Sequence, residues 1–393
     1  MSTRHWMAVG LAAVLTLGVG AGCAKQESAA SDSTEIPIGV DIEKSGPASV
    51  QGEAYERALK LVARQINANG VKVGNQTKKI KLIVRDNKSD PAESLSVAKS
   101  LIDNDNVAAI IGGGASPTTM SIVDTVEAKK VPLVSMGSSG AIVQPIDKRK
   151  YIFKTPGNTP VIADVMLKQF QRKGIKKIAV LSVDNAYGAA GLKAWQDLDK
   201  AGKIDLVDNE KFGDKDKDFT VQVTKAVAKH PDAVVVWAIP PQAGIAAQNL
   251  RQAKYPSNQV YFDTGAGAEL FVKGAGSASE GMYMVHSRVL AGDQITATTP
   301  AAQAEKKFFT DYSRDYGNFS GFAPMAADAL SLIVQAITKG GRADRETIRD
   351  SLEKLTFDGA FGTYQFSPTN HGGVDESSLA LLVVKNGTWT LTS

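Results

Sequence analysis

The stretch Val107–Thr119, VAAIIGGGASPTT, runs from a short apolar segment into three glycines and then into Ala115, Ser116 and Pro117. A glycine-rich turn between a strand and a helix brings main-chain N–H groups close to an anionic group. A phosphate-binding loop would end in Gly-Lys-Ser/Thr, whereas no lysine lies between the start of this stretch and Val126. The stretch therefore predicts a strand–turn–helix unit whose turn faces an anion smaller than a nucleotide.

The alternation of strand and helix continues on both sides of this stretch. Short β-branched runs indicate further buried strands, at residues 36–40, 79–84, 131–135, 176–183 and 232–239. Between them lie amphipathic segments such as residues 53–70, in which apolar side chains recur at helical spacing and Gly70 is the expected C-cap. A Lys385-Asn386-Gly387 turn predicts a hairpin near the C-terminus. We expect an α/β fold of parallel sheets covered by helices on both faces.

The length of the chain and two breaks in the pattern predict two lobes. A chain of 393 residues with 43% hydrophobic content is long enough for two domains. Two prolines and a glycine interrupt the pattern at residues 151–160, and a second crossover is expected near residues 280–289. We expect the first lobe to hold residues 36–155 and 286–365, and the second to hold residues 156–285 and 366–393.

The N-terminus has the pattern of a secretory signal. A basic start precedes an almost wholly apolar run, Trp6–Val19, and small residues follow up to Cys23. Cys23 is the only cysteine, and its position resembles the lipidation site of bacterial lipoproteins, although Gly20 stands where those sites usually carry leucine. The alternative is an ordinary cleaved signal with an incidental cysteine. We expect a signal peptide over residues 1–22 and a flexible tether over residues 23–35.

Charge and motifs argue against several classes of protein. The net charge of +4 is small for this length and the lysines are dispersed, so we expect no nucleic-acid partner. No stretch after the signal is apolar enough to cross a bilayer, so a membrane contact is expected only through a lipid anchor. The histidines show no metal-ligand spacing, and no Gly-x-Ser-x-Gly elbow is present. We expect a protein that is not an enzyme and that needs neither a cofactor nor a metal.

Several motifs occur in the order seen in one family. They are IPIGVDIEKSGPASVQG (36–52), VAAIIGGGAS (107–116), VPLVSMGSSG (131–140), VDNAYGAAGLKAW (183–195) and SASEGMYM (277–284). Over nearly all of residues 36–393, the chain resembles the solute-binding proteins of branched-chain amino acid importers, the leucine/isoleucine/valine-binding protein family. The resemblance implies the type I periplasmic binding fold, in which two doubly wound parallel-sheet lobes are joined by a three-crossover hinge around a ligand cleft.

The resemblance also implies a function and partners. Such a protein captures a small molecule by hinge closure and delivers it to an ABC permease and ATPase complex in the membrane. We expect a monomer in the periplasm or at the outer face of the bacterial cytoplasmic membrane. A ligand-sensing surface receptor of the same fold, without a transporter, is the alternative that the sequence leaves open.

Ligand contacts are implied in both lobes. Ser116 takes the position of a hydroxyl that binds the ligand's carboxylate together with backbone N–H groups, and Ser139 takes the position of a second hydroxyl. Gly137 stands where a carbonyl accepts the ligand's amino group. Tyr187 and Phe322 match aromatic residues that wall the cleft. The structural alternatives are a helix N-cap for Ser116, a plain turn for the other serine, and core packing for the aromatic residues.

The residues expected at the ligand's amino end depart from the family pattern. Thr264 stands where amino-acid-binding members carry a glutamate that neutralises the ligand's ammonium group, and an uncompensated ammonium would be costly in a closed cleft. Asp263 is adjacent, but neighbours on an extended chain point to opposite faces. It could serve only where the loop has left strand geometry, and Glu269 is the other candidate.

The expected side-chain pocket departs as well. Ile239, beside Trp237, replaces a pocket tyrosine, and Gln51 replaces an aromatic residue. The carboxylate end of the site therefore looks retained, whereas the amino and side-chain ends look rebuilt. We expect a ligand with a carboxylate, either an amino acid or an aromatic or short aliphatic carboxylic acid without an α-amino group.

Overall fold

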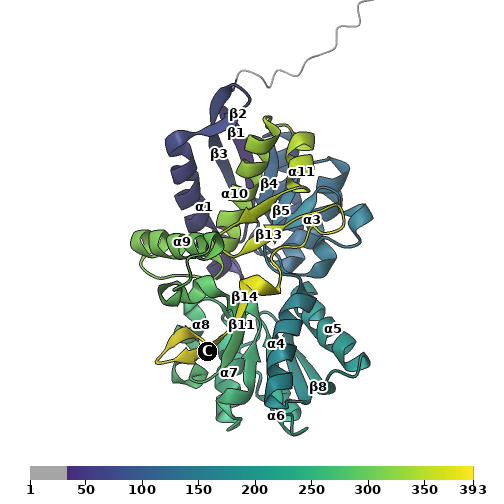
Figure 1. Ribbon diagram of the computed structural model, residues 1–393. Helices are drawn as coiled ribbons and strands as arrows, with labels where there is room; N and C mark the ends of the chain where they lie inside the picture. Colours follow the sequence, from purple (N-terminus) through teal and green to yellow (C-terminus); the bar gives the residue numbers. More distant parts are fainter. Residues whose placement is uncertain (1–32, 393) are drawn as a thin grey trace, which may run out of the picture. The chain divides into compact units, whose positions relative to one another are not determined.

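The computed structural model describes residues 33–392 of the chain. The predicted signal peptide, Cys23 and most of the predicted tether lie outside these residues. The described chain is built on two sheets, each flanked by helices, one above the other in the view of Figure 1. Among the helices of residues 33–392, none combines the length and the apolar character needed to cross a membrane.

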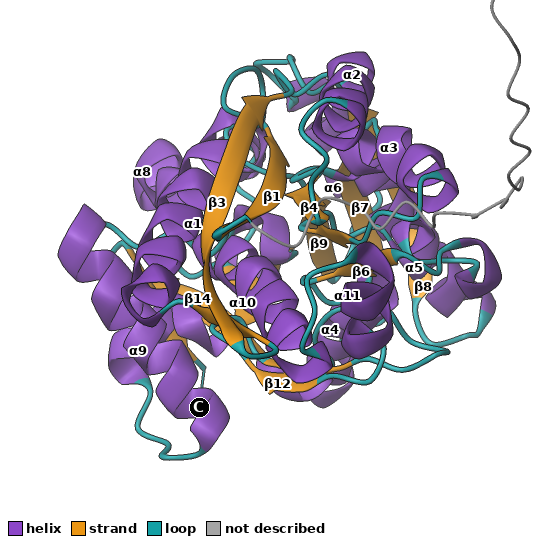
Figure 2. Ribbon diagram, turned by 90° about the horizontal axis from the view of Figure 1, so that it is seen from above, coloured by secondary structure: helices purple, strands orange, loops and turns teal. Residues whose placement is uncertain are grey.

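The first sheet has six strands in the order β2-β3-β1-β4-β5-β6. Its neighbours run parallel, except for the antiparallel pair β2 and β3. Apolar side chains of α1 and α10 pack on one face, and those of α2 and α3 pack on the other (Figure 2). The strands are β1 Glu35–Ile42, β2 Val71–Val73, β3 Gln76–Asp86, β4 Ala109–Gly112, β5 Leu133–Ser135 and β6 Ile152–Lys154; the helices are α1 Ser49–Asn69, α2 Pro91–Asp103, α3 Ser116–Ala128, α10 Ala323–Gly340 and α11 Arg345–Leu352.

The second sheet has seven strands in the order β15-β14-β11-β10-β9-β7-β8. Strands β7 to β11 are parallel, and β14 and β15 add an antiparallel edge. Helices α4 and α5 pack on one face, and α6, α7 and α8 pack on the other. The strands are β7 Lys177–Val183, β8 Asp205–Phe212, β9 Ala233–Trp237, β10 Val260–Phe262, β11 Tyr283–Ser287, β14 Leu379–Lys385 and β15 Thr388–Leu391; the helices are α4 Thr159–Lys173, α5 Ala186–Lys200, α6 Thr220–Val227, α7 Gln242–Gln252 and α8 Glu269–Ala275.

The chain passes between the two sheets three times. It leaves the first sheet after β6, returns after β11 to reach α10, and crosses again to reach β14. Helix α9 (Pro300–Tyr316) lies on the second connection, and the small hairpin β12 (Thr356–Asp358) and β13 (Thr363–Gln365) precedes the third. The predicted fold of two doubly wound lobes with three crossovers is confirmed. The lobe limit predicted at residue 286 falls inside β11, and the chain leaves the second sheet only after Ser287.

Strand order fixes where a ligand can bind. In each sheet the first strand of the doubly wound unit has neighbours on both sides, so the order in which strands are added reverses beside it: between β1 and β4 in the first sheet, and between β7 and β9 in the second. Ligands of such sheets bind in the crevice outside the carboxyl ends of the strands at this switch point. A ligand is therefore expected beside the segments that follow β1, β4, β7 and β9.

The backbone has positive φ angles at the predicted end of α1 and at the predicted C-terminal turn. Helix α1 ends at the predicted Gly70, whose φ is 71°, but it starts at Ser49, four residues before the predicted apolar periodicity. The C-terminal hairpin turns at Asn386 and Gly387, with φ values of 52° and 70°, as the Asn-Gly pair predicts.

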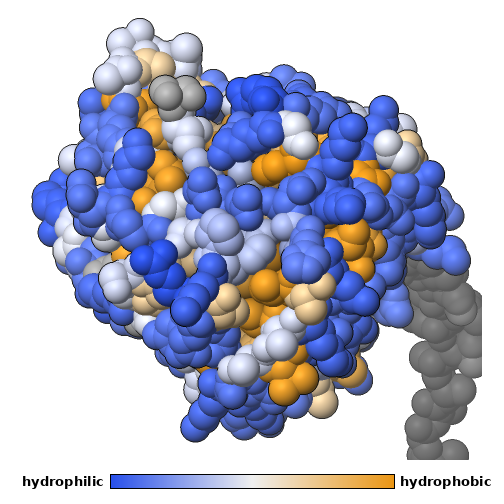
Figure 3. Space-filling view, turned by 90° about the horizontal axis from the view of Figure 1, so that it is seen from below, coloured by the Kyte–Doolittle hydropathy of each residue, from blue (hydrophilic) through white to orange (hydrophobic). Residues whose placement is uncertain are grey.

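One end of the molecule is mainly hydrophilic, with apolar side chains in separate patches (Figure 3). Over the described residues, Val221 is the one large hydrophobic side chain that is strongly exposed, at 65%. The strands and helices have therefore directed nearly all of their large apolar side chains into the cores of the two lobes.

Candidate functional site

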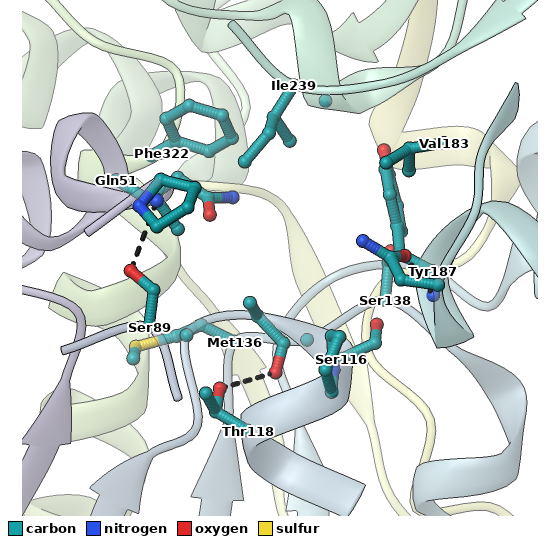
Figure 4. A pocket seen from close by; sticks show the side chains of 18 of the residues that line it. Gln51, Ser89, Ser116, Thr118, Met136, Ser138, Val183, Tyr187, Ile239 and Phe322 are labelled. Atoms are coloured by element: carbon teal, nitrogen blue, oxygen red, sulfur yellow. Dashed lines mark hydrogen bonds between the residues drawn. The ribbon is translucent and has the colours of Figure 1, made fainter. Parts of the chain in front are cut away.

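A cavity lies between the lobes at both switch points, with about 90 Å³ open to the centres of water molecules. In Figure 4, Ile239 and Phe322 lie opposite Ser116, Met136 and Thr118, while Val183 and Tyr187 close a third side. The wall is made by Pro47, Ala48, Gln51, Tyr55, Ser89, Gly114, Ala115, Ser116, Pro117, Thr118, Met136, Gly137, Ser138, Pro156, Val183, Asn185, Tyr187, Asp214, Ile239, Gln242, Thr264, Gly265, Phe322 and Met325.

The first lobe contributes the N-terminus of α3. Ser116 is the first residue of this helix, Ala115 before it is extended, and Pro117 occupies the first turn without an N–H to satisfy. No side chain caps the helix, so Ser116 is not an N-cap. Its Oγ instead accepts a hydrogen bond from the Ser139 N–H at 3.2 Å, which ties the loop after β4 to the loop after β5.

Gly137 allows these two loops to approach each other. A Cβ at this position would lie 2.8 Å from Ile142 Cδ1, 2.9 Å from Thr119 Oγ1 and 3.3 Å from Ser116 Cα. A larger residue would therefore push the loop after β5 away from the start of α3. The glycine keeps both loops in the wall of the same cavity.

An acidic side chain of the protein itself lies behind this wall. Glu43, just after β1, is fully buried, and its Oε1 accepts hydrogen bonds from Ala115 N–H at 3.0 Å and from Thr118 Oγ1 at 2.6 Å. Burial raises the pKa of Glu43 above its ordinary value. The N–H group of Ala115, just before α3, therefore already has a partner within the protein, and the ligand is left with the other N–H groups.

A lysine lies behind the other loop. Lys154 is fully buried at the end of β6 and donates to the carbonyl oxygens of Ser138, at 2.6 Å, and Gly157, at 3.3 Å. Burial lowers the pKa of Lys154 to about 7. Its side-chain amino group, when protonated, adds positive potential next to the loops that carry Ser116 and Ser138.

The second lobe contributes Tyr187, which is held by Asp263. The hydroxyl of Tyr187 donates to Asp263 Oδ2, which also accepts from Gly265 N–H at 3.0 Å. The chain leaves strand geometry after Phe262, so the Asp263 side chain turns back to cap a short 3₁₀ turn, η4 (Thr264–Ala266). Burial raises the pKa of Asp263 to about 7.

The sequence matches the periplasmic binding protein family over residues 35–388. The chain belongs to this family. The leucine-, isoleucine-, valine-, threonine-, and alanine-binding protein of Pseudomonas aeruginosa is 26% identical over 359 residues, which cover 89% of this chain and 87% of that protein. The crystal structure of an extracellular ligand-binding receptor from Rhodopseudomonas palustris HaA2 has a TM-score of 0.83 at 25% identity, and the match covers 91% of this chain and 100% of the receptor.

A further solved structure shares the fold. It is the branched-chain amino acid transporter substrate binding protein of Streptococcus pneumoniae in complex with isoleucine, with a TM-score of 0.78, 24% identity and coverage of 90% of this chain and 97% of that one. Both solved structures therefore share the fold that the sequence predicts for this chain.

Seven of the ten predicted ligand contacts line the cavity: Gln51, Ser116, Gly137, Tyr187, Ile239, Thr264 and Phe322. The other three, Ser139, Trp237 and Asp263, do not. Ser138 takes the place in the wall expected for Ser139, whose N–H instead holds Ser116. Trp237 is fully buried and its ring would meet a Cβ at Gly191 at 2.3 Å, so it fills the space between β9 and α5. Asp263 lies behind Tyr187, and the Glu269 side chain lies outside the described part of the chain.

Sequence reasoning missed part of the wall. Tyr55 lies on the apolar face predicted for residues 53–70, where a core position is expected, but it lines the cavity and meets Phe322 edge-on at a centroid distance of 6.2 Å. Asn185 and Gln242 follow β7 and β9 at the switch point of the second sheet and could have been found from their place after apolar runs. Met136 and Met325 carry no sequence signal beyond apolar character.

The residues of the wall are suited to binding a small molecule. Among its residues only Asp214, which is exposed, carries an ionisable carboxylate, and none is a lysine, arginine or histidine. Over the described chain, no group of three or more His, Cys, Asp or Glu side chains could hold a metal ion. The cavity combines aromatic and aliphatic surfaces with hydroxyl and amide groups, which suits a ligand with an apolar body and a few hydrogen-bonding atoms.

Proposed function

We propose that the protein is the extracytoplasmic solute-binding component of an ABC importer and captures a small carboxylate-bearing ligand by hinge closure. The observation that carries the proposal is the position of Ser116, on the cavity wall at the N-terminus of α3. A helix N-terminus carries about half a positive charge and offers N–H groups to an anion. The hydroxyl groups of Ser116 and Ser138 add donors at the same end of the cavity.

The opposite wall supports a ligand without an α-amino group. Thr264 lines the cavity but cannot neutralise an ammonium group, and Asp263 is already engaged by Tyr187 and Gly265. Aromatic and short aliphatic acids therefore fit this end better than amino acids. The alternative, an amino acid, is favoured by the Pseudomonas aeruginosa relative, which is named for binding leucine, isoleucine, valine, threonine and alanine.

A thermal-unfolding panel tests the ligand class. It would hold leucine, phenylalanine, their 2-oxo acids and simple aromatic carboxylates. A ligand at 100 times its dissociation constant stabilises a protein by about 2.7 kcal/mol, which is roughly 3–4 °C for a cooperative unit of this size. Stabilisation by no carboxylate in the panel would overturn the proposal.

Anchoring is a separate part of the proposal. Cys23, at the end of the signal, would carry the lipid that holds the protein at the outer face of the membrane. A Cys23→Ser variant should move from the membrane fraction into the soluble extracytoplasmic fraction. Retention in the membrane would argue against lipidation.

The second candidate function is a ligand-sensing receptor without a transporter. The same cavity would serve it, so the two are separated by uptake. Cells that lack this protein should lose uptake of the ligand identified in the panel if it serves an importer. Normal uptake, together with a lost transcriptional or behavioural response, would favour the receptor.

A further inference from the structure

Glu43 connects three segments that surround the ligand's carboxylate end. Its Oε1 accepts from Ala115 N–H at 3.0 Å and Thr118 Oγ1 at 2.6 Å, both at the start of α3. It also accepts from Asn87 Nδ2 at 3.3 Å, in the segment between β3 and α2. Glu43 itself follows β1, one of the two strands at the switch point of the first sheet.

The second oxygen of Glu43 faces the wall of the cavity. Oε2 is buried and has no hydrogen-bond partner, and it lies 2.3 Å from where a Cβ on Gly114 would be placed. Gly114 and Tyr55 both line the cavity, and the Tyr55 ring would meet the same Cβ at 2.5 Å. A negative charge on Glu43 would therefore lie directly behind the backbone that a ligand carboxylate must approach.

The ionisable groups around Glu43 do not neutralise such a charge. Asp41, on β1, is a second fully buried carboxyl group that interacts with Glu43, and Asp86 at the end of β3 adds a third negative group to this cluster. Tyr55, on α1, interacts with Glu43 and supplies no positive charge. On α3 and α2, the facing side chains are the neutral Thr118 and Ser94. No lysine or arginine of residues 33–392 forms an ion pair with Glu43.

We infer that Glu43 makes the binding of a carboxylate proton-linked, so that the anionic ligand binds together with one proton taken up by Glu43. The inference rests on the proposed function, because it assumes a carboxylate at the start of α3. The reaction balances as a ligand anion, a proton and the ionised protein giving a complex in which the Glu43 carboxyl is neutral. Glu43 then determines specificity by excluding anions when it is itself ionised.

The hydrogen bonds suit both states of the carboxyl group. When Glu43 is ionised, Oε1 accepts from Ala115 N–H and from the Thr118 hydroxyl. When it is protonated, it can donate to Thr118 Oγ1, which then donates to the Ala115 carbonyl oxygen at 2.9 Å. Burial already raises the pKa of this group, which favours its neutral form.

Calorimetric titration with benzoate and 4-methyl-2-oxopentanoate, between pH 5.5 and 8.5, tests the inference. In the unmodified protein, affinity should fall by up to tenfold for each pH unit once Glu43 ionises. Runs in two buffers of different ionisation enthalpy should show uptake of up to one proton, and this readout needs no variant. Glu43→Gln keeps an oxygen for Ala115 and Thr118, and should bind more tightly above pH 7 with little dependence on pH.

Glu93→Gln is the matched control, because Glu93 is a partly exposed acid in the first turn of α2 that pairs with Lys88, and its loss should leave the pH dependence unchanged. Binding without proton uptake would overturn the inference and leave the proposed function standing. A pH dependence that survives in Glu43→Gln would also overturn it, and would point to another group such as Lys154. If neither acid binds at any pH, both the proposed function and the inference fail.

Discussion

Ser116 Oγ accepts a hydrogen bond from the Ser139 N–H at 3.2 Å, so the loop after β4 and the loop after β5 meet at one side chain. Because this contact uses the oxygen as an acceptor, the hydroxyl hydrogen of Ser116 remains available to a ligand. Ser116 therefore holds the two loops of the wall together and can also donate a hydrogen bond to an anionic ligand. Its substitution should affect both, and the two effects can be measured separately.

Ser116→Ala should weaken the binding of a carboxylate ligand by roughly 10- to 100-fold, since a hydrogen bond to a charged group contributes about 1.5–3 kcal/mol. The measurement is a titration with the best acid of the panel. Ser121→Ala is the control, because this serine of α3 donates to the Thr118 carbonyl and is absent from the cavity wall. Equal affinity of Ser116→Ala and Ser121→Ala for the ligand would show that Ser116 does not bind it.

Gly114→Ala should destabilise the first lobe by about 1–3 kcal/mol, because its Cβ would meet Glu43 Oε2 at 2.3 Å and the Tyr55 ring at 2.5 Å. Urea unfolding measures the loss. Gly140→Ala is the control, since nothing lies within 4 Å of a Cβ there. Similar unfolding midpoints for both variants would mean that the loop before α3 relaxes easily.

Thr264→Glu should favour amino acids. A carboxylate at this position of the wall would face the ligand's amino end, so the affinity for leucine relative to 4-methyl-2-oxopentanoate should rise by about 10- to 100-fold. Thr264→Gln has a similar size without the charge and should leave the ratio close to that of the unmodified protein. If the affinity for leucine relative to 4-methyl-2-oxopentanoate does not change in Thr264→Glu, the amino group of the ligand does not lie beside residue 264.

Asp41 should make stability depend on pH. It is fully buried, Ser94 Oγ lies 2.6 Å from its Oδ2, and burial raises its pKa to about 7. The folded state holds the proton of Asp41 more tightly than the unfolded state does. The contribution of Asp41 to the free energy of unfolding is therefore complete below pH about 4 and is lost as the pH rises to about 7.

Between pH 5 and 7, the free energy of unfolding should therefore fall more steeply in the unmodified protein than in Asp41→Asn, by up to about 1.4 kcal/mol per pH unit. Urea unfolding at several pH values measures both slopes. Identical slopes would show that Asp41 is already ionised in the folded protein at the lower pH.

The fold could be predicted wherever strands are buried on both faces. β1, β4, β7 and β9 are nearly continuous apolar runs, and their order with the intervening helices indicates two doubly wound sheets. The edge strand β8 was missed because its sequence, DLVDNEKF, is charged and half exposed, as edge strands often are. A search for buried apolar runs cannot detect a strand with this charged and half-exposed sequence.

The site could be predicted in part, because residues that directly follow a recognisable buried strand can be placed at its carboxyl end. Ser116 and Tyr187 follow strands directly, where the fold places a ligand, and both line the cavity. Trp237, also predicted in the site, is the last residue of β9, and its ring packs against Gly191 of α5 outside the cavity wall. Glu43 carries no sequence signal of burial, since its partners Asn87, Ala115 and Thr118 are distant in sequence and gather around it only when β1, β3 and β4 pair.

The most direct test of a carboxylate at the start of α3 compares an acid with its own amide. Titration of the protein with benzoate and benzamide, or with the best acid of the panel and its amide, changes the charge of that end and little else. The account predicts that the acid binds at least tenfold more tightly at pH 6, and that Ser116→Ala removes most of the difference. Equal affinity for acid and amide, or tighter binding of the amide, would contradict it.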